Sequence, residues 1–216
     1  MILQERLEKL HTISLTEGAH KPDSEFCIME AVAWVAGEPW TDSPQCTCPV
    51  ISAFLRSWND SLPSDADRDR LLKPLIPRVI GTRSTKPVEK RRALMAADWL
   101  VRVHTPAWLR LAGLTAQAET LERLPEITSM AQVPSIRGPI EAVRQDAAAA
   151  QAAARDAAQA AAWAAAWDAA RDAAWAAAWA TAQAAARDKL KPTMLELQTS
   201  AVQLVERMIA ASEETA

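Results

Sequence analysis

Glycine, tyrosine and phenylalanine are scarce in this chain of 216 residues, which has five glycines, two phenylalanines and no tyrosine. Loops that cradle nucleotide phosphates need several closely spaced glycines, so a phosphate-binding loop of that kind is not expected. Runs in which β-branched and polar residues alternate, the main signal of strands, are also lacking. The sequence therefore predicts an all-α protein.

A secretion signal and a long uncharged apolar run are likewise missing, because arginine and aspartate interrupt even the alanine-rich part of the chain. The formal net charge of −3 gives no general attraction to nucleic acid or anionic lipid. Three cysteines make an odd number, and without a secretion signal we expect them to be reduced. The expectation is a cytoplasmic protein that does not associate with a membrane.

The most regular feature is the stretch from Gln145 to Asp188, which consists largely of alanine. Alanine has the highest helix propensity, and neither glycine nor proline occurs between Ile140 and Lys191. The stretch therefore predicts one helix, roughly 65 Å long at about 1.5 Å per residue. Larger residues interrupt the alanines at every fourth position: Gln151, Arg155, Gln159, Trp163, Trp167, Arg171, Trp175, Trp179, Gln183 and Arg187.

Residues four apart do not stay on one face of a helix, because each step of four turns by about 400° and shifts the row by about 40°. The tryptophans from Trp163 to Trp179 therefore form a ridge that winds around the axis. Arg171 lies one turn from Trp167 and from Trp175, within reach of cation–π contacts. Exposed indole rings in this number would make a larger apolar patch than monomers usually carry, so we expect the helix to have a partner.

Shorter amphipathic segments precede this stretch and predict a compact helical domain over residues 1–134, followed by a helical extension over residues 135–216. Within the domain, helices are expected at residues 2–13, 25–36, 49–59, 65–72, 87–104, 105–111 and 115–124. Ser24 is the expected N-cap of the second of these helices.

Two prolines are expected to separate helices. Thr105 and Pro106 look like the cap and first residue of a new short helix. Pro192, after Lys191, is expected to end the long helix. A final helix over residues 193–211 would then fold back on the long helix as an antiparallel hairpin.

Residue types that bind zinc occur around the second predicted helix. His20 precedes this helix, Cys27 lies in its first turn, and Cys46 and Cys48 follow it. A zinc site needs several such groups to converge, and a loop that returns along the helix would bring these four together. One alternative is therefore a metal-binding protein or metalloenzyme centred on the three cysteines. The competing interpretation is that they are buried as small apolar residues.

Basic residues are concentrated between Arg68 and Arg92, which offers a second alternative, nucleic-acid binding. The candidates for phosphate contacts are Arg78, Arg83, Lys90 and Arg91. Carboxylates are interspersed among these cations, and this pattern favours a solvated face held by salt bridges instead.

Several short motifs between Cys27 and Asp60 resemble those of a known group of proteins. These motifs are Met-Glu-Ala at 29–31, Ala-Gly-Glu-Pro-Trp at 36–40, Cys-Thr-Cys-Pro at 46–49 and Trp-Asn-Asp at 58–60. With the Leu-Lys-Pro-Leu-Ile-Pro-Arg segment at 72–78 and the Ala-rich tail, the chain resembles helical proteins of actinobacteria and their phages. The resemblance implies a cytoplasmic bacterial or phage setting and no catalytic residue.

Together these patterns favour a non-enzymatic helical interaction protein. The alanine- and tryptophan-rich helix would mediate self-association into a homo-oligomer or binding to another protein. The interaction residues would be Trp163, Trp167, Arg171, Trp175 and Trp179.

Overall fold

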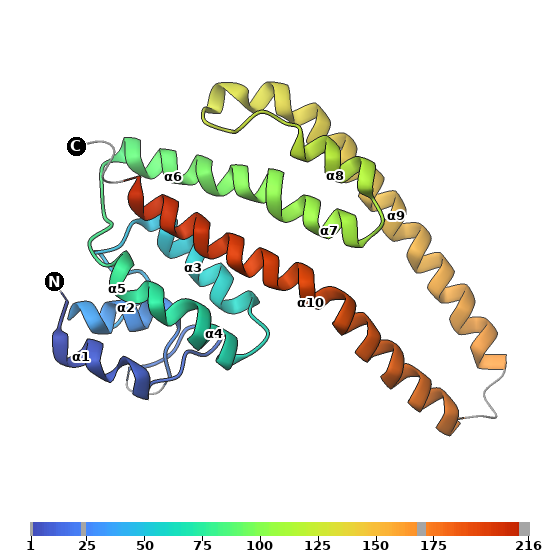
Figure 1. Ribbon diagram of the computed structural model, residues 1–216, viewed down its shortest axis with the longest axis horizontal. Coiled ribbons are helices and arrows are strands. Elements are labelled where there is room, and N and C mark those ends of the chain that lie inside the picture. The colour runs from blue at the N-terminus through green and yellow to red at the C-terminus, as the bar shows by residue number, and fades with distance from the viewer. Residues whose placement is uncertain (1, 23–24, 168–171, 212–216) are drawn as a thin grey trace. The chain divides into compact units, whose positions relative to one another are not determined.

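The computed structural model describes residues 2–22, 25–167 and 172–211, and for residues 156–167 and 172–187 it describes the backbone alone. Regular structure in this part of the chain is helical (Figure 1). Within it, β-structure is limited to one isolated parallel bridge between Leu15 and Phe26. The prediction of an all-α fold is confirmed.

In chain order the α-helices are α1 (Gln4–Glu8), α2 (Ile28–Ala36), α3 (Pro49–Ser61), α4 (Asp65–Leu72), α5 (Ile76–Val79), α6 (Lys86–Trp99), α7 (Thr105–Leu111), α8 (Thr115–Glu122), α9 (Val133–Trp167) and α10 (Asp172–Ala210). Short 3₁₀ segments are η1 (Lys9–Thr12), η2 (Lys73–Leu75) and η4 (Met130–Gln132), and η3 (Leu100–His104) is a π-helix.

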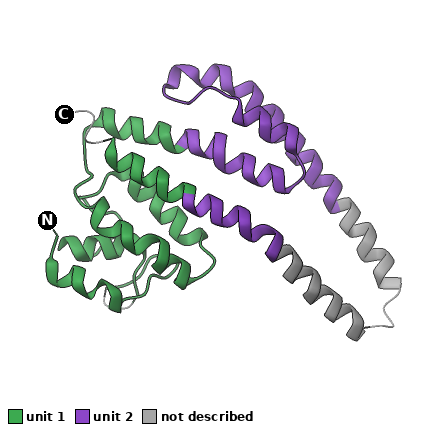
Figure 2. Cartoon of the chain, in the orientation of Figure 1, with its two compact units in different colours: residues 1–96, 200–216 green, residues 97–199 purple. Residues whose placement is uncertain are grey.

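Two compact units divide the chain (Figure 2). Unit 1 consists of residues 1–96 and 200–216, and unit 2 of residues 97–199. Both boundaries fall inside helices, because α6 and α10 each contribute residues to both units. The boundary predicted after Pro134 lies within unit 2 instead, where this proline occupies the first turn of α9 and so costs no backbone hydrogen bond.

The core of unit 1 is built around α2, of whose nine residues seven are buried. This helix packs against α3 and α5. Ile51 and Leu55 of α3 and Ile76 of α5 are fully buried. The end of α10 also belongs to this unit, where its Leu204 and Met208 are fully buried.

Unit 2 has its own smaller core. Leu109 of α7, Ala118 and Leu121 of α8, and Val143 of α9 form a buried apolar cluster. Partly buried apolar residues pack against this cluster: Val101, Leu114, Leu124, Ile140 and Ala147. Ala147 is therefore the position at which α9 leaves the core of the unit.

The second helix begins later than the sequence predicts. The expected start was residue 25, whereas α2 begins at Ile28 with Cys27 as its N-cap. Ser24, the predicted cap, lies outside the described residues. The delay follows from Phe26, whose carbonyl accepts a hydrogen bond from the Thr16 N–H at 2.8 Å, so the chain stays extended here.

The short helix predicted over residues 105–111 is found as α7, with Pro106 in its first turn, whereas the predicted break before it is wrong. The chain runs from α6 through the π-helical turn η3 into α7. Proline has no N–H to donate to the carbonyl of Arg102, and the wider turn accommodates this gap. In it, both the N–H and the hydroxyl of Thr105 donate to the Leu100 carbonyl, the hydroxyl at 2.7 Å.

The predicted helix end at Lys191 and Pro192 is also wrong, because Pro192 lies inside α10. The carbonyl that loses its partner is that of Asp188, an exposed residue, so water can satisfy it. Of the single helix predicted from Gln145 to Asp188, α9 covers the part up to Trp167 and α10 the part from Asp172, and residues 168–171 lie outside the described residues.

Candidate functional site

Cys27 and Glu30 satisfy each other's backbone amides at the start of α2. Cys27 Sγ accepts a hydrogen bond from the Glu30 N–H at 3.5 Å, and Glu30 Oε2 accepts one from the Cys27 N–H at 2.7 Å. This is a capping box in which cysteine replaces the usual serine or threonine. Burial raises the pKa of the Cys27 thiol to about 12, so at neutral pH the group is a thiol and a weak nucleophile.

Glu30 also fastens the loop that precedes α2. Its buried carboxylate accepts hydrogen bonds from the His20 N–H at 2.7 Å and from His20 Nδ1 at 2.9 Å. On the other side of the imidazole, His20 Nε2 lies 3.0 Å from Thr16 Oγ1 and 3.4 Å from Glu25 Oε2. The His20 carbonyl accepts a hydrogen bond from Trp40 Nε1 at 2.9 Å. Glu30 is thus the centre of this network.

The order of Thr16 hydroxyl, His20 imidazole and Glu30 carboxylate is that of the nucleophile, base and carboxylate in hydrolase triads. Hydrolysis also needs a substrate cleft and donors for the developing oxyanion. The Thr16 backbone is fully engaged within the fold, because its N–H donates to Phe26 and its carbonyl accepts from Asn59 Nδ2. We therefore interpret the network as structural.

Cys46 and Cys48 lie against a different part of unit 1, the turn after α5. The Cys46 carbonyl accepts hydrogen bonds from the Gly81 N–H at 2.9 Å and the Arg83 N–H at 3.2 Å. The Cys48 N–H donates to Thr82 Oγ1 at 3.1 Å. The backbone of this Cys-x-Cys segment is therefore fixed to the turn between α5 and α6.

Of the four predicted zinc ligands, His20 and Cys27 share a contact with Glu30, whereas Cys46 and Cys48 have other neighbours. Among the described residues, no three histidine, cysteine or acidic side chains are placed to hold one metal ion. The zinc site stays a prediction, and the contacts of Cys27 identify a different role for it as a helix cap.

Replacing Cys27 with serine distinguishes these roles. Serine is a preferred N-cap, so Cys27→Ser is expected to change the free energy of unfolding by less than about 1 kcal/mol. Cys27→Ala removes the acceptor and is expected to cost about 1 kcal/mol more than the serine variant. Urea denaturation, with zinc analysis of both proteins, measures this. A serine variant that loses bound zinc and as much stability as the alanine variant would establish Cys27 as a metal ligand.

Carboxylates engage at least two of the four predicted phosphate contacts. Arg78 is paired with Glu206, and Arg83 Nε lies 3.8 Å from Glu89 Oε1. The other two, Lys90 and Arg91, are exposed on α6. The pairing agrees with the interpretation of this segment as a salt-bridged surface.

Two arginines of the same segment are buried, and each holds the end of a helix. Arg92 Nε donates to the Met208 carbonyl near the end of α10 at 2.7 Å, and its Nη1 donates to the Thr82 carbonyl at 2.6 Å. Arg68 donates to two carbonyls at the end of α3, each at 2.8 Å. A cation suits these positions because carbonyl groups at a helix C-terminus lack partners and carry partial negative charge.

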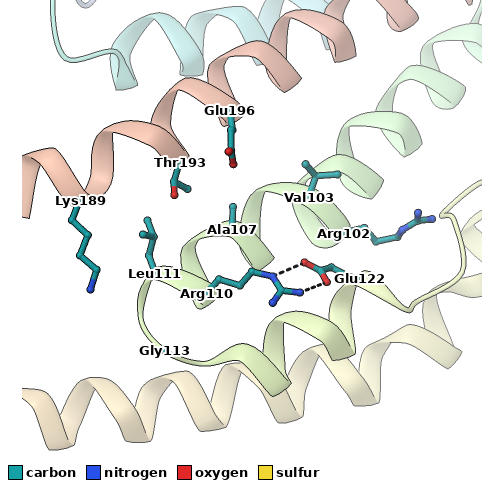
Figure 3. Close-up of a pocket in the computed structure, with 10 residues that line it drawn as sticks. All are labelled: Arg102, Val103, Ala107, Arg110, Leu111, Gly113, Glu122, Lys189, Thr193 and Glu196. Atoms are coloured by element: carbon teal, nitrogen blue, oxygen red, sulfur yellow. Dashed lines mark hydrogen bonds and ion pairs between the residues drawn. The ribbon is translucent and has the colours of Figure 1, made fainter.

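Unit 2 contains a cleft of about 690 Å³ between α7, α8 and α10 (Figure 3). One wall is an apolar row of side chains one turn apart, formed by Val103, Ala107 and Leu111. Thr193 and Glu196 project from α10 toward this row. The cleft therefore has an apolar wall opposite a polar one.

Charged groups of both signs surround the same cleft. Arg110 forms a forked ion pair with Glu122, with Nε–Oε1 and Nη2–Oε2 distances of 3.1 and 2.6 Å. The hydrogen bond to Glu122 raises the pKa of Arg110 above its ordinary value. Lys189 extends from α10 at one end of the cleft. Because positive and negative groups both line the cleft, its charge favours neither a simple anion nor a simple cation as a ligand.

An aromatic cluster lies at the π-helical turn of unit 2. The His104 ring is 5.1 Å from that of Trp99 and 6.2 Å from that of Trp108, measured between centroids. Burial lowers the pKa of His104, and its neutral Nε2 accepts a hydrogen bond from Trp108 Nε1 at 3.2 Å. Trp108 remains 38% exposed, so the cluster presents an indole surface to solvent.

The side chains predicted to mediate the interaction lie outside the described residues: Trp163, Trp167, Arg171, Trp175 and Trp179.

No protein-family model, curated protein or solved structure matches this chain. The resemblance to actinobacterial and phage proteins therefore stays a prediction. In the described part of the chain, no helix is long and apolar enough to span a membrane.

Proposed function

We propose that this protein is a non-enzymatic helical interaction protein that self-associates through unit 2. The distribution of exposed apolar side chains carries the proposal. Among the described residues, seven large apolar side chains are exposed, and six of them belong to unit 2. They are Leu100, Val103, Trp108, Met130, Val133 and Leu195. Because apolar surface is stabilised by removal from water, this concentration favours unit 2 as the part that meets a partner.

The exposure of α9 supports the same unit. From Ala148 to Arg155 nearly every residue is exposed, so successive faces of the helix are open to solvent. Most helices in proteins are stabilised by packing of one face, whereas this segment depends on the high propensity of alanine. Methyl side chains also let another helix approach closely, which suits a helix that packs against a second copy.

The tryptophan repeat provides enough apolar area for a stable contact. Each indole removes roughly 150–250 Å² from water when buried, so four contribute roughly 600–1,000 Å². A typical stable interface buries about 800 Å² on each partner. Between Gln145 and Asp188 five aspartates outnumber three arginines, so attraction to a polyanion contributes little.

Removal of the four indoles is expected to dissociate the assembly. In the fourfold variant Trp163→Ala, Trp167→Ala, Trp175→Ala and Trp179→Ala, we expect at least a thousandfold weaker association, about 4 kcal/mol, since buried interface tryptophans commonly contribute 1–2 kcal/mol or more each. Alanine favours helix, so circular dichroism should show no loss of helix. Size-exclusion chromatography with light scattering measures the mass.

The matched control replaces four other large residues with alanine: Gln145→Ala, Gln151→Ala, Gln159→Ala and Gln183→Ala. It changes the same number of positions in the same stretch and is expected to assemble like the wild type. If the wild type and both variants all have the mass of one chain, the proposed self-association is wrong. If the wild type is a monomer and binds a different protein through these tryptophans, the surface serves to bind that protein and not a second copy.

A further inference from the structure

The cleft of unit 2 is large enough to hold aromatic rings, and one of its walls is apolar. Its volume of about 690 Å³ lies within the range of roughly 300–1,000 Å³ that encloses drug-sized ligands. The small side chain of Ala107 lies between Val103 and Leu111 in the apolar row. Val103 is 39% exposed, so part of this wall is open to solvent. An occupant can therefore bury apolar groups against this wall.

The spacing of the row matches the spacing of the tryptophan repeat. Ala107 and Leu111 are four residues apart in α7, which places them about 6 Å apart along the helix, and Val103 precedes them in the π-helical turn η3. Trp163 and Trp167 are also four residues apart and have the same rise. Ridges formed by residues four apart pack into the grooves of a similar row in the commonest class of helix packing.

The charges around the cleft suit indole rings better than an ionic ligand. Arg110 is already engaged by Glu122, and the guanidinium in such a pair still presents its planar face. Lys189, at one end of the cleft, supplies an ammonium group. Both cation types are attracted to the face of an aromatic ring, and tryptophan is the strongest partner.

We propose that this cleft receives tryptophans of the four-residue repeat from a second copy of the chain. The inference rests on the proposed self-association and adds the surface on which the repeat docks. Each chain then carries both a ridge of indoles and a receptor for it. Close approach of the two chains is possible because the residues between the indoles are almost all alanine.

Blocking the cleft is expected to weaken association at least about tenfold, equivalent to about 1.4 kcal/mol. Ala107→Gln places a long polar side chain in the middle of the apolar row and preserves helix propensity. Ala116→Gln, at an exposed alanine of α8 in the same unit, is the control and should assemble normally. Leu111→Gln is a second blocking variant, and circular dichroism establishes that each protein remains folded.

Mixing two full-length variants gives the decisive test. The Ala107→Gln chain has the tryptophans and a blocked cleft, whereas the fourfold Trp→Ala chain has an open cleft and no indoles. At a protein concentration near the wild-type dissociation constant, each should be largely monomeric alone. Their mixture should form a heterodimer through the one intact ridge-and-cleft contact, and sedimentation velocity with one variant fluorescently labelled detects it.

The outcomes separate the two proposals. A wild type that remains monomeric overturns both. If the wild type assembles and the fourfold Trp→Ala variant does not, the proposed function stands. In that case, normal assembly by both blocking variants, or a mixture that stays monomeric, shows that the tryptophans dock elsewhere and overturns the cleft assignment alone.

Discussion

Replacement of Arg92 by methionine is expected to lower the free energy of unfolding by about 3 kcal/mol. Methionine preserves much of the side-chain length but donates no hydrogen bond. The Met208 carbonyl and the Thr82 carbonyl would each lose a donor in a buried position. Because Arg92 joins α6 to the end of α10, the loss should release the C-terminal turns of α10 from unit 1.

Arg91→Met is the control for this prediction. Arg91 is the adjacent residue and is exposed, so the same chemical change should cost less than about 1 kcal/mol. Urea denaturation followed by circular dichroism gives both values, and hydrogen exchange of the α10 amides reports its release. Equal stabilities for the two variants would show that Arg92 does not hold the end of α10 against α6.

Replacement of Glu30 by glutamine is expected to cost about 2–4 kcal/mol, because three N–H groups converge on the buried carboxylate. These groups are the Cys27 amide and the amide and Nδ1 of His20. An amide side chain has one acceptor oxygen, and its NH₂ group would face donors. The loop before α2 should then lose its attachment, which limited proteolysis would detect.

Glu25→Gln makes the same chemical change beside the same imidazole. The Glu25 side chain is 62% exposed and lies 3.4 Å from His20 Nε2, so its loss is expected to cost no more than about 0.5 kcal/mol. Chemical denaturation of both variants compares the two carboxylates directly. A Glu30→Gln protein as stable as the Glu25→Gln protein would contradict the central place given to Glu30.

The existence of most helices could be predicted from the sequence, because apolar periodicity and helix propensity act locally. The helices predicted to begin at residues 49 and 65 are found as α3, with Pro49 at its first position, and α4, with Ser64 as its cap. The start of α2 was missed because it depends on a distant contact, the pairing of Phe26 with Leu15. Local propensity contains no information about such a contact.

Prolines caused the other errors. Pro106 and Pro192 both predict helix ends, since proline removes a hydrogen bond and crowds the preceding turn. Each lies within continuous helical structure. The π-helical turn accommodates Pro106. Pro192 cannot donate a hydrogen bond to the Asp188 carbonyl, but Asp188 is exposed, so water can donate one instead. Whether a proline bends, widens or ends a helix depends on surroundings that the sequence does not reveal.

The candidate sites were predicted less well than the helices. His20 and Cys27 both form hydrogen bonds with Glu30, a residue that no sequence pattern singles out. Arg68 and Arg92 read as surface cations because arginine is rarely buried. Their carbonyl partners lie on other helices and become visible only in the folded chain.

The central claim is that unit 2 brings two copies of this chain together. Sedimentation equilibrium of the full-length wild type, over a wide range of protein concentration, tests it most directly. We expect the average mass to rise with concentration from that of one chain to at least that of two. A mass equal to one chain at every concentration would contradict the claim.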